Sequence, residues 1–235
     1  TASNNVAIGK DSLKVNTTGA NHIAVGQGAM VANTTGNDNV AVGRQALDAN
    51  TTGGSNVAMG SDALGANVTH SNNVAVGYNA LLVNVADDNT AVGSGALDAN
   101  TSGNGLVGIG RNALGANTTA SENTAVGGNA LGANTTGANN TAVGYAALDA
   151  NTTGGSNVAV GKNAAGATTT GTSNTAIGTS ALLVNTTGAA NVAVGHLALD
   201  ANTTADNNVA VGYSALTANT TGANNVAVGY AALDA

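Results

Sequence analysis

The chain of 235 residues contains no cysteine, proline, phenylalanine or tryptophan. The absence of cysteine excludes disulfides and thiolate metal sites. Aromatic residues make up only 2% of the sequence, so the hydrophobic fraction of 43% is supplied by alanine, valine and leucine above all. We therefore expect a thin core that is filled by small aliphatic side chains.

Charge is also scarce. Only 7% of the residues are charged and the net charge is −7, whereas binding to nucleic acid requires a basic stripe. No apolar run is long enough to cross a membrane, and no signal peptide pattern starts at Thr1. We therefore expect no nucleic-acid partner and no membrane insertion in this segment. Because the first residue is not methionine and neither end carries a capping unit, we expect a piece of a longer fibre.

The dominant feature of the sequence is a repeat of the form N-V-A-V-G-Y-x-A-L-D-A-N-T-T-G-A-N. One glycine marks each copy and is taken as position 0. Consecutive markers are seventeen residues apart, except for the sixteen residues between Gly77 and Gly93. A fixed short period predicts one stacked solenoid over residues 1–235. The fourteen markers are Gly9, Gly26, Gly43, Gly60, Gly77, Gly93, Gly110, Gly127, Gly144, Gly161, Gly178, Gly195, Gly212 and Gly229.

Each repeat contains two short runs of alternating residues. Positions −3 and −1 carry valine, isoleucine, methionine or threonine, which predicts a strand with these side chains inward. Position +4 is leucine in twelve copies and +6 is alanine or valine, which predicts a second strand. A single helical turn is the alternative for the second run, but so short a helix is unstable alone. We predict an all-β parallel β-solenoid, a flattened two-strand roll with 14 coils of about 17 residues.

Position −2 never carries a side chain larger than a methyl group. If −3 and −1 point inward, −2 points outward, and a flat stripe of small apolar residues predicts a self-association face. The alternative is a coil so thin that these residues are interior. The predicted face consists of Ala7, Ala24, Ala41, Ala58, Ala75, Ala91, Ala125, Ala142, Ala159, Ala176, Ala193, Ala210 and Ala227.

Positions +1 and +5 vary freely, which is typical of a solvent-facing ridge. Position +1 holds every tyrosine and four of the five basic residues. Tolerated surface variation explains this column, and contact with a receptor or glycan is the functional alternative. The predicted recognition ridge consists of Arg44, Tyr78, Arg111, Tyr145, Lys162, His196, Tyr213 and Tyr230.

Asparagine recurs at −4 and +7, with His22, Leu106 and Thr168 as exceptions. Stacked amides can form hydrogen-bonded ladders. One alternative is a polar binding comb, which is a row of exposed amides that binds a ligand. The other is N-glycosylation, because Asn16-Thr17-Thr18 and most equivalents are N-x-T sequons. The threonine columns also leave an ice-binding array as a remote alternative.

No catalytic or metal-binding pattern is present. The histidines His22, His70 and His196 occupy three different columns, and no nucleophile has a histidine or acid at matching spacing. Calcium-binding β-rolls place aspartate next to the repeated glycines, which does not occur here. We expect no enzyme activity, no cofactor and no metal.

The units resemble a known family. Asn5-Val6-Ala7-Ile8-Gly9 and its copies are similar to the YadA-type head repeats of trimeric autotransporter adhesins. The segment from Thr141 to Gly154 also resembles repeats in phage tail fibres and related surface fibres that end in a chaperone domain. The resemblance implies a homotrimeric, left-handed parallel β-roll outside the cell or on a virion that mediates attachment. An open filament with a purely structural role, or a tail-fibre shaft, is the alternative.

Overall fold

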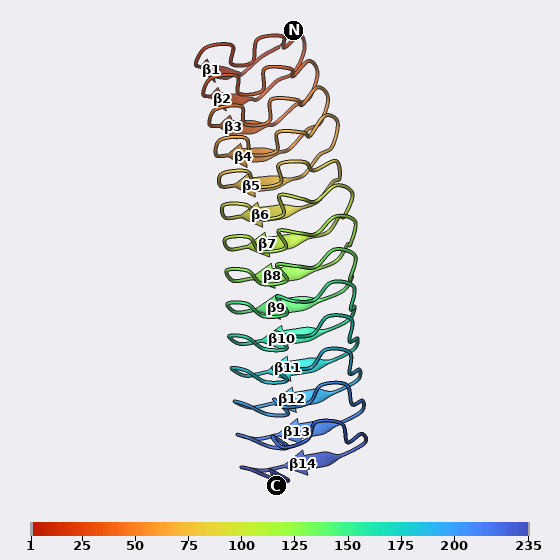
Figure 1. Cartoon of the computed structure of the whole chain (residues 1–235). Coiled ribbons are helices and arrows are strands. Elements are labelled where there is room, and N and C mark those ends of the chain that lie inside the picture. The colour runs from red at the N-terminus through yellow and green to blue at the C-terminus, as the bar shows by residue number, and fades with distance from the viewer. Residues whose placement is uncertain (1, 235) are drawn as a thin grey trace. The chain divides into compact units, whose positions relative to one another are not determined.

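The computed structural model describes residues 2–234, and the chain divides into two compact units, Thr1–Thr119 and Ala120–Ala235. Each unit contains seven short parallel strands (Figure 1). The first unit contains β1 (Val6–Ile8), β2 (Ile23–Val25), β3 (Val40–Val42), β4 (Val57–Met59), β5 (Val74–Val76), β6 (Thr90–Val92) and β7 (Val107–Ile109). The second contains β8 (Thr124–Val126), β9 (Thr141–Val143), β10 (Val158–Val160), β11 (Thr175–Ile177), β12 (Val192–Val194), β13 (Val209–Val211) and β14 (Val226–Val228).

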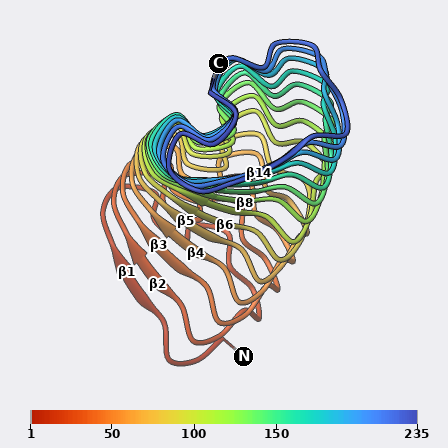
Figure 2. The same cartoon turned by 90° about the horizontal axis from the view of Figure 1, so that it is seen from below.

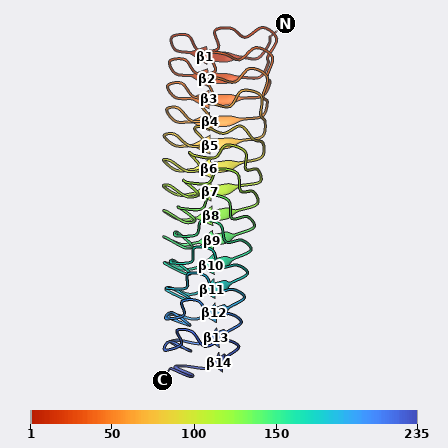
Figure 3. The same cartoon turned by 45° about the vertical axis from the view of Figure 1, so that its right-hand side comes forward.

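Within each unit, every strand pairs in parallel with the strand one repeat later, and equivalent positions face each other. Ala24 lies opposite Ala41, for example, and Ala159 lies opposite Ala176. The register is preserved across the sixteen-residue repeat, where Val74 lies opposite Thr90. Figure 3 shows the strands of each unit at the same place in successive coils. The all-β parallel β-solenoid with about seventeen residues per coil is therefore confirmed.

Each coil has one strand rather than two. The second run, which includes the conserved leucine position, forms a turn in which positions +2 and +4 both take a left-handed backbone. Leu47 and Leu64 have φ of 53° although a bulky residue disfavours this region. Burial of a leucine side chain contributes roughly 1.5–3 kcal/mol, which offsets a strain of about 1–3 kcal/mol. The prediction of a two-strand roll is therefore wrong in this detail.

Backbone hydrogen bonds also join neighbouring coils outside the strands. The amide of Leu47 donates to the carbonyl of Ala63 at 2.9 Å, and the amide of Thr34 donates to the carbonyl of Thr51 at 2.9 Å. Figure 2, which looks along the stack, shows that neighbouring coils of a unit follow nearly the same path. Because the coils satisfy one another's polar groups almost all the way round, a coil depends on its neighbours.

The strand faces are reversed relative to the sequence prediction. Alanines at −2 are fully buried from Ala24 to Ala210, whereas the larger residues at −3 and −1 are half-buried or exposed. The interior is filled by Ala at −2 and +3, Leu at +4 and the asparagines at −4 and +7. A coil this thin has no room for a second layer of valines.

The predicted alanine self-association face is therefore wrong, and the thin-coil alternative is confirmed. Buried in the core are Ala24, Ala41, Ala58, Ala75, Ala91, Ala125, Ala142, Ala159, Ala176, Ala193, Ala210 and Ala227, whereas Ala7 in the first coil is exposed. A side chain inside its own coil cannot contact a second chain.

The marker glycines allow each coil to lie on the next. Gly60 has φ of 142°, and a Cβ added to it would lie 2.3 Å from the carbonyl oxygen of Gly77. Only glycine fits a position that combines a positive φ with so close a backbone approach. The marker that reveals the repeat in the sequence is thus a steric requirement of the stack.

Candidate functional surfaces

The outer face of the strands carries half-buried or exposed apolar side chains in every coil of each unit. It consists of positions −3 and −1, which carry 24 aliphatic or methionine side chains and four threonines in the fourteen strands. None of these residues is charged. Exposed fractions are 44% at Ile23, 43% at Met59 and 40% at Ile177, and they rise to 68% at Val228 in the last strand. We call this surface the sheet face; contiguous apolar patches of this kind mark interaction sites.

The +1 ridge is exposed at every predicted residue: Arg44, Tyr78, Arg111, Tyr145, Lys162, His196, Tyr213 and Tyr230. These residues therefore face solvent as predicted, whereas most residues at +5, such as Val31 and Leu82, are half-buried. Recognition of a receptor or glycan by the ridge stays a prediction.

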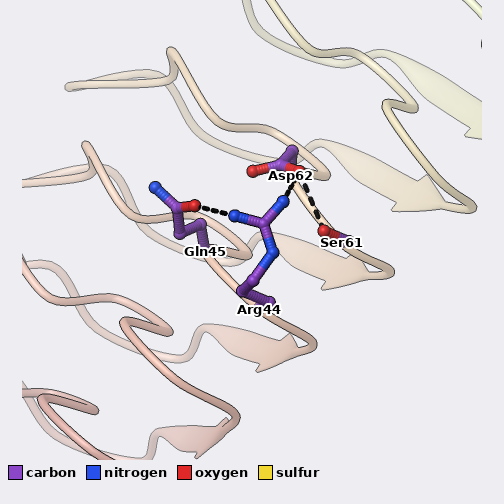
Figure 4. Close-up of polar contacts among 4 residues, drawn as sticks. All are labelled: Arg44, Gln45, Ser61 and Asp62. Carbon is purple, nitrogen blue, oxygen red and sulfur yellow. Dashed lines mark hydrogen bonds and ion pairs between the residues drawn. The ribbon is translucent and has the colours of Figure 1, made fainter.

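Arg44 is held by neighbouring side chains. Its guanidinium forms an ion pair of 2.6 Å with Asp62 in the next coil and donates to the side-chain oxygen of Gln45 (Figure 4). The hydroxyl of Ser61 donates to the same carboxylate at 2.8 Å. Exposed pairs of this kind contribute little to stability, about 0–1 kcal/mol. They do occupy Arg44, which is therefore less available to a ligand.

Three ridge residues of the second unit form an aromatic stack. The ring centroids of His196 and Tyr213 are 5.3 Å apart with an interplanar angle of 12°, and those of Tyr213 and Tyr230 are 5.3 Å apart at 9°. Each ring covers a face of the next. Sugars stack on ring faces, so the stack offers a ligand ring edges and hydroxyls along its length rather than open faces.

The asparagines at +7 form the predicted amide ladder. The side-chain amide of Asn50 donates to Oδ1 of Asn33 at 2.8 Å, and that of Asn151 donates to Oδ1 of Asn134 at 2.8 Å. The same amide also donates to the carbonyl three residues later, as from Asn50 to Gly53 at 3.0 Å. The ladder hypothesis is confirmed, and the column is not a binding comb because these side chains are buried.

The ladder fails at two places in the described residues, and each leaves buried polar atoms unpaired. Oδ1 of Asn151 and Oγ1 of Thr168 have no partner where threonine replaces asparagine. Oδ1 of Asn67 has none where the next coil is the sixteen-residue one. A buried polar atom without a partner costs about 1–3 kcal/mol, so these are weak points of the stack.

The asparagines at −4 bind the backbone, and some of them also bond to one another, as from the side-chain amide of Asn174 to Oδ1 of Asn157 at 3.2 Å. Oδ1 of Asn39 accepts from the amide of Asn56 at 2.9 Å, and its side-chain amide donates to the Gly53 carbonyl at 2.8 Å. His22 reproduces this pattern. Its Nδ1 accepts from the amide of Asn39 at 3.3 Å, and its ring also contacts the Gly36 carbonyl. Burial lowers the pKa of His22, and the contact with Gly36 partly offsets this effect.

The sequon asparagines of the inner coils are inaccessible, whereas Asn16 and Asn219 near the two ends are half-buried. Asn33, Asn50, Asn134 and Asn202 are fully buried, and their amides are engaged in the ladder or with the backbone. N-glycosylation at +7 is incompatible with this packing, because the sugar would have to replace an interior hydrogen bond.

Four aspartates at +5, Asp48, Asp98, Asp149 and Asp200, are partly buried. Burial raises the pKa of each carboxyl, and hydrogen bonds to nearby backbone amides partly oppose this effect. Asp48 also lines a groove of about 290 Å³ in the first unit together with Gln27, Arg44 and other residues at +1, +2 and +5. The acids are separated by three coils, so they do not form a carboxylate pair.

Within residues 2–234, no group of three or more histidine, aspartate or glutamate side chains could hold a metal ion. The same residues contain no helix with the length and apolar character needed to cross a membrane.

Comparison with protein families, characterised proteins and solved structures finds no match to this chain. The surfaces themselves therefore carry the functional argument. The sequence prediction missed the sheet face because it assigned the larger aliphatic residues to the interior. The asparagine at −4 was the available indication. It lies two residues from −2 and so shares its face, and its amide needs buried hydrogen-bond partners.

Proposed function

We propose that the chain is a non-enzymatic segment of an extracellular fibre that associates with further copies of itself and mediates surface attachment. One observation carries the proposal: the sheet face is apolar, uncharged and repeated in every coil. Monomeric proteins rarely leave a contiguous apolar patch larger than a few hundred Å² exposed.

A second copy of the chain fits this face better than an unrelated partner. The apolar side chains recur once per coil, about 4.8 Å apart, so a partner must share that period to stay in register over several coils. Only another copy is certain to have it. The acidic surface elsewhere, with a net charge of −7, repels a second copy, whereas the sheet face carries no charge. Three copies, as in the resembling adhesins, are the expected assembly.

A double substitution on one strand tests the self-association. Val192→Lys with Val194→Lys places two charges on the sheet face, and the charges would be buried without partners in an assembly. We expect the variant to be monomeric by light scattering. Thr179→Lys adds one charge on the exposed +1 ridge and should leave the assembly intact. If the double variant assembles like the unmodified protein, the sheet face is not the interface.

Attachment is proposed to depend on the +1 ridge. Replacing Tyr145, Tyr213 and Tyr230 with Ser should abolish binding to the target surface and leave assembly unchanged, because these side chains are exposed and lie outside the sheet face. Unchanged attachment would contradict this role.

The alternative is a purely structural filament or shaft. The stack of His196, Tyr213 and Tyr230 favours it, since rings that cover one another stabilise the coils rather than contact a ligand. If the chain is a structural filament, the triple tyrosine variant should still assemble and bind as the unmodified protein does. Only its free energy of unfolding should decrease. The remote ice-binding alternative requires thermal hysteresis, and a solution without it excludes that role.

A further inference from the structure

Position +9 carries an exposed hydroxyl in every coil that has this position. The residue is threonine in eleven coils and serine in one, and all twelve side chains are exposed. The column consists of Thr18, Thr35, Thr52, Thr69, Ser102, Thr119, Thr136, Thr153, Thr170, Thr187, Thr204 and Thr221. The exchange of threonine for serine retains the hydroxyl and loses the methyl group.

The neighbouring threonines at +8 have a structural role that those at +9 lack. The hydroxyl of Thr152 donates to the carbonyl of Thr169 at 3.1 Å, and that of Thr169 donates to Thr186 at 3.1 Å. Among the described residues, no hydrogen bond involves a +9 hydroxyl. Two adjacent columns of the same residue type therefore differ in whether the hydroxyl serves the fold.

The sixteen-residue coil shows that the fold does not require position +9, because this is the position it lacks. The amide of Val85 still donates to the next coil at 2.9 Å, and the side chain of Asn84 reaches the Ala86 carbonyl at 2.7 Å. The strand register of Val74 with Thr90 is unchanged. Positions +1 and +5 vary widely, so the copies have diverged; the hydroxyl at +9 has nevertheless been retained.

The N-x-T sequon does not explain the column. In the inner coils the sequon asparagine at +7 is buried and bonded within the ladder, as at Asn50. In the segment Thr168-Thr169-Thr170 the asparagine is missing, yet the hydroxyl residue at +9 remains. The +9 hydroxyl is thus retained independently of the asparagine.

We infer that the +9 hydroxyls are acceptors for O-linked glycosylation. The hydroxyl oxygen attacks the anomeric carbon of a nucleotide-activated sugar supplied by a separate transferase. A C–O bond forms, the bond from that carbon to the nucleoside diphosphate breaks, and the hydroxyl proton passes to a base of the transferase. The inference goes beyond attachment and self-association and does not depend on either.

The surroundings of the column favour a neutral sugar. The +9 residues lie in a bend and are followed by glycine in nine of the twelve coils, so a transferase meets little side-chain obstruction. Phosphate would place groups of about −1.5 to −2 charge only about 4.8 Å apart on a chain that is already acidic. Sugars add no charge, and twelve of them would cover one edge of the coils with hydroxyls.

Intact-mass and fragmentation mass spectrometry of the protein isolated from the cells that produce it tests the inference. We expect a mass above that of the polypeptide by a whole number of sugar residues, and fragments that place these sugars on +9 residues. Thr153→Val, Thr170→Val and Thr187→Val made together should remove the sugars of three sites. The matched control, Thr152→Val with Thr169→Val and Thr186→Val, deletes three hydroxyls at +8 and should retain the sugars at +9.

A bare polypeptide mass would overturn the inference. Sugars located on asparagine or on +8 threonines, or phosphate in place of sugar, would also overturn it. Circular dichroism of both triple variants shows whether the coils are intact, and a loss of sugar counts in favour only when they are.

Discussion

The side-chain amide of Asn50 donates a hydrogen bond of 2.8 Å to Oδ1 of Asn33 in the preceding coil, with both residues fully buried. Each of these asparagines is both donor and acceptor, so the ladder satisfies the amides only while it is continuous. An interruption of the ladder therefore leaves particular buried amide atoms without a hydrogen-bond partner, which destabilises the fold. Repair of the interruption should stabilise the stack.

Thr168→Asn should stabilise the protein. The new amide can donate to Oδ1 of Asn151, which has no partner, and its oxygen can accept from Asn185. We expect a gain of about 1–2 kcal/mol in the free energy of unfolding, measured by denaturant titration. The reciprocal change Asn202→Thr breaks bonds of 3.0 and 3.3 Å to Asn185 and Asn219 and should cost a similar amount. Equal stability of both variants would mean that the ladder contributes nothing.

Gly60→Ala should destabilise the protein by more than about 2 kcal/mol, because the new Cβ meets the Gly77 carbonyl in a backbone region that disfavours alanine. Gly65→Ala is the control. The nearest atom to its Cβ would lie 3.4 Å away, and its backbone has no positive φ. This control should stabilise the protein slightly, by about 0.5 kcal/mol. Thermal unfolding of the two variants decides whether the marker position is a steric requirement.

His22 should make stability depend on pH. Its pKa in the folded protein lies below the ordinary value of 6.5, so the unfolded chain binds the proton more readily. Stability is therefore expected to be constant above about pH 7 and to fall as the pH drops below the unfolded pKa of about 6.5. His22→Asn restores the residue type of the column and should remove this fall. The measurement is the free energy of unfolding of both proteins from about pH 7.5 to about pH 5, a range that brackets the ordinary histidine pKa. Parallel curves for the two proteins would contradict the role of His22 in the pH dependence.

Asp149 should have the opposite effect at lower pH. Burial raises its folded pKa above 3.8, so the charged carboxylate destabilises the folded state at neutral pH and protonation relieves this. Asp149→Asn is expected to raise stability at neutral pH by less than about 1 kcal/mol, since the group is partly solvated. Its advantage should disappear as the pH falls through the folded pKa. The exposed Glu122→Gln is the control, and an equal gain there would point to net charge instead.

The repeat could be predicted from the sequence because its cause is local. A marker glycine with φ near 140° and a close carbonyl admits no other residue, so it recurs in every coil. The amide ladder was predictable for the same reason: asparagine at Asn33 and Asn50 has hydrogen-bond partners only if its equivalents are asparagine too.

The orientation of the strands could not be read from residue size. Valine at −3 or −1 is a better core residue than alanine by hydrophobicity, yet Ala41 is buried whereas Val40 and Val42 are half-exposed. The thinness of the coil decides this, and thinness depends on the turn at +2 to +4. Leu47 and its equivalents adopt a left-handed backbone that leucine rarely takes, so no local rule predicts that turn.

The mass of the protein in solution tests the central claim most directly. Light scattering coupled to size exclusion should give a whole multiple of the chain mass, and we expect three copies. The reason is that the sheet face exposes apolar side chains over the seven coils of a unit, and a surface of this kind is expected to be covered by a partner. A single-chain mass that persists as the concentration is raised would contradict the account.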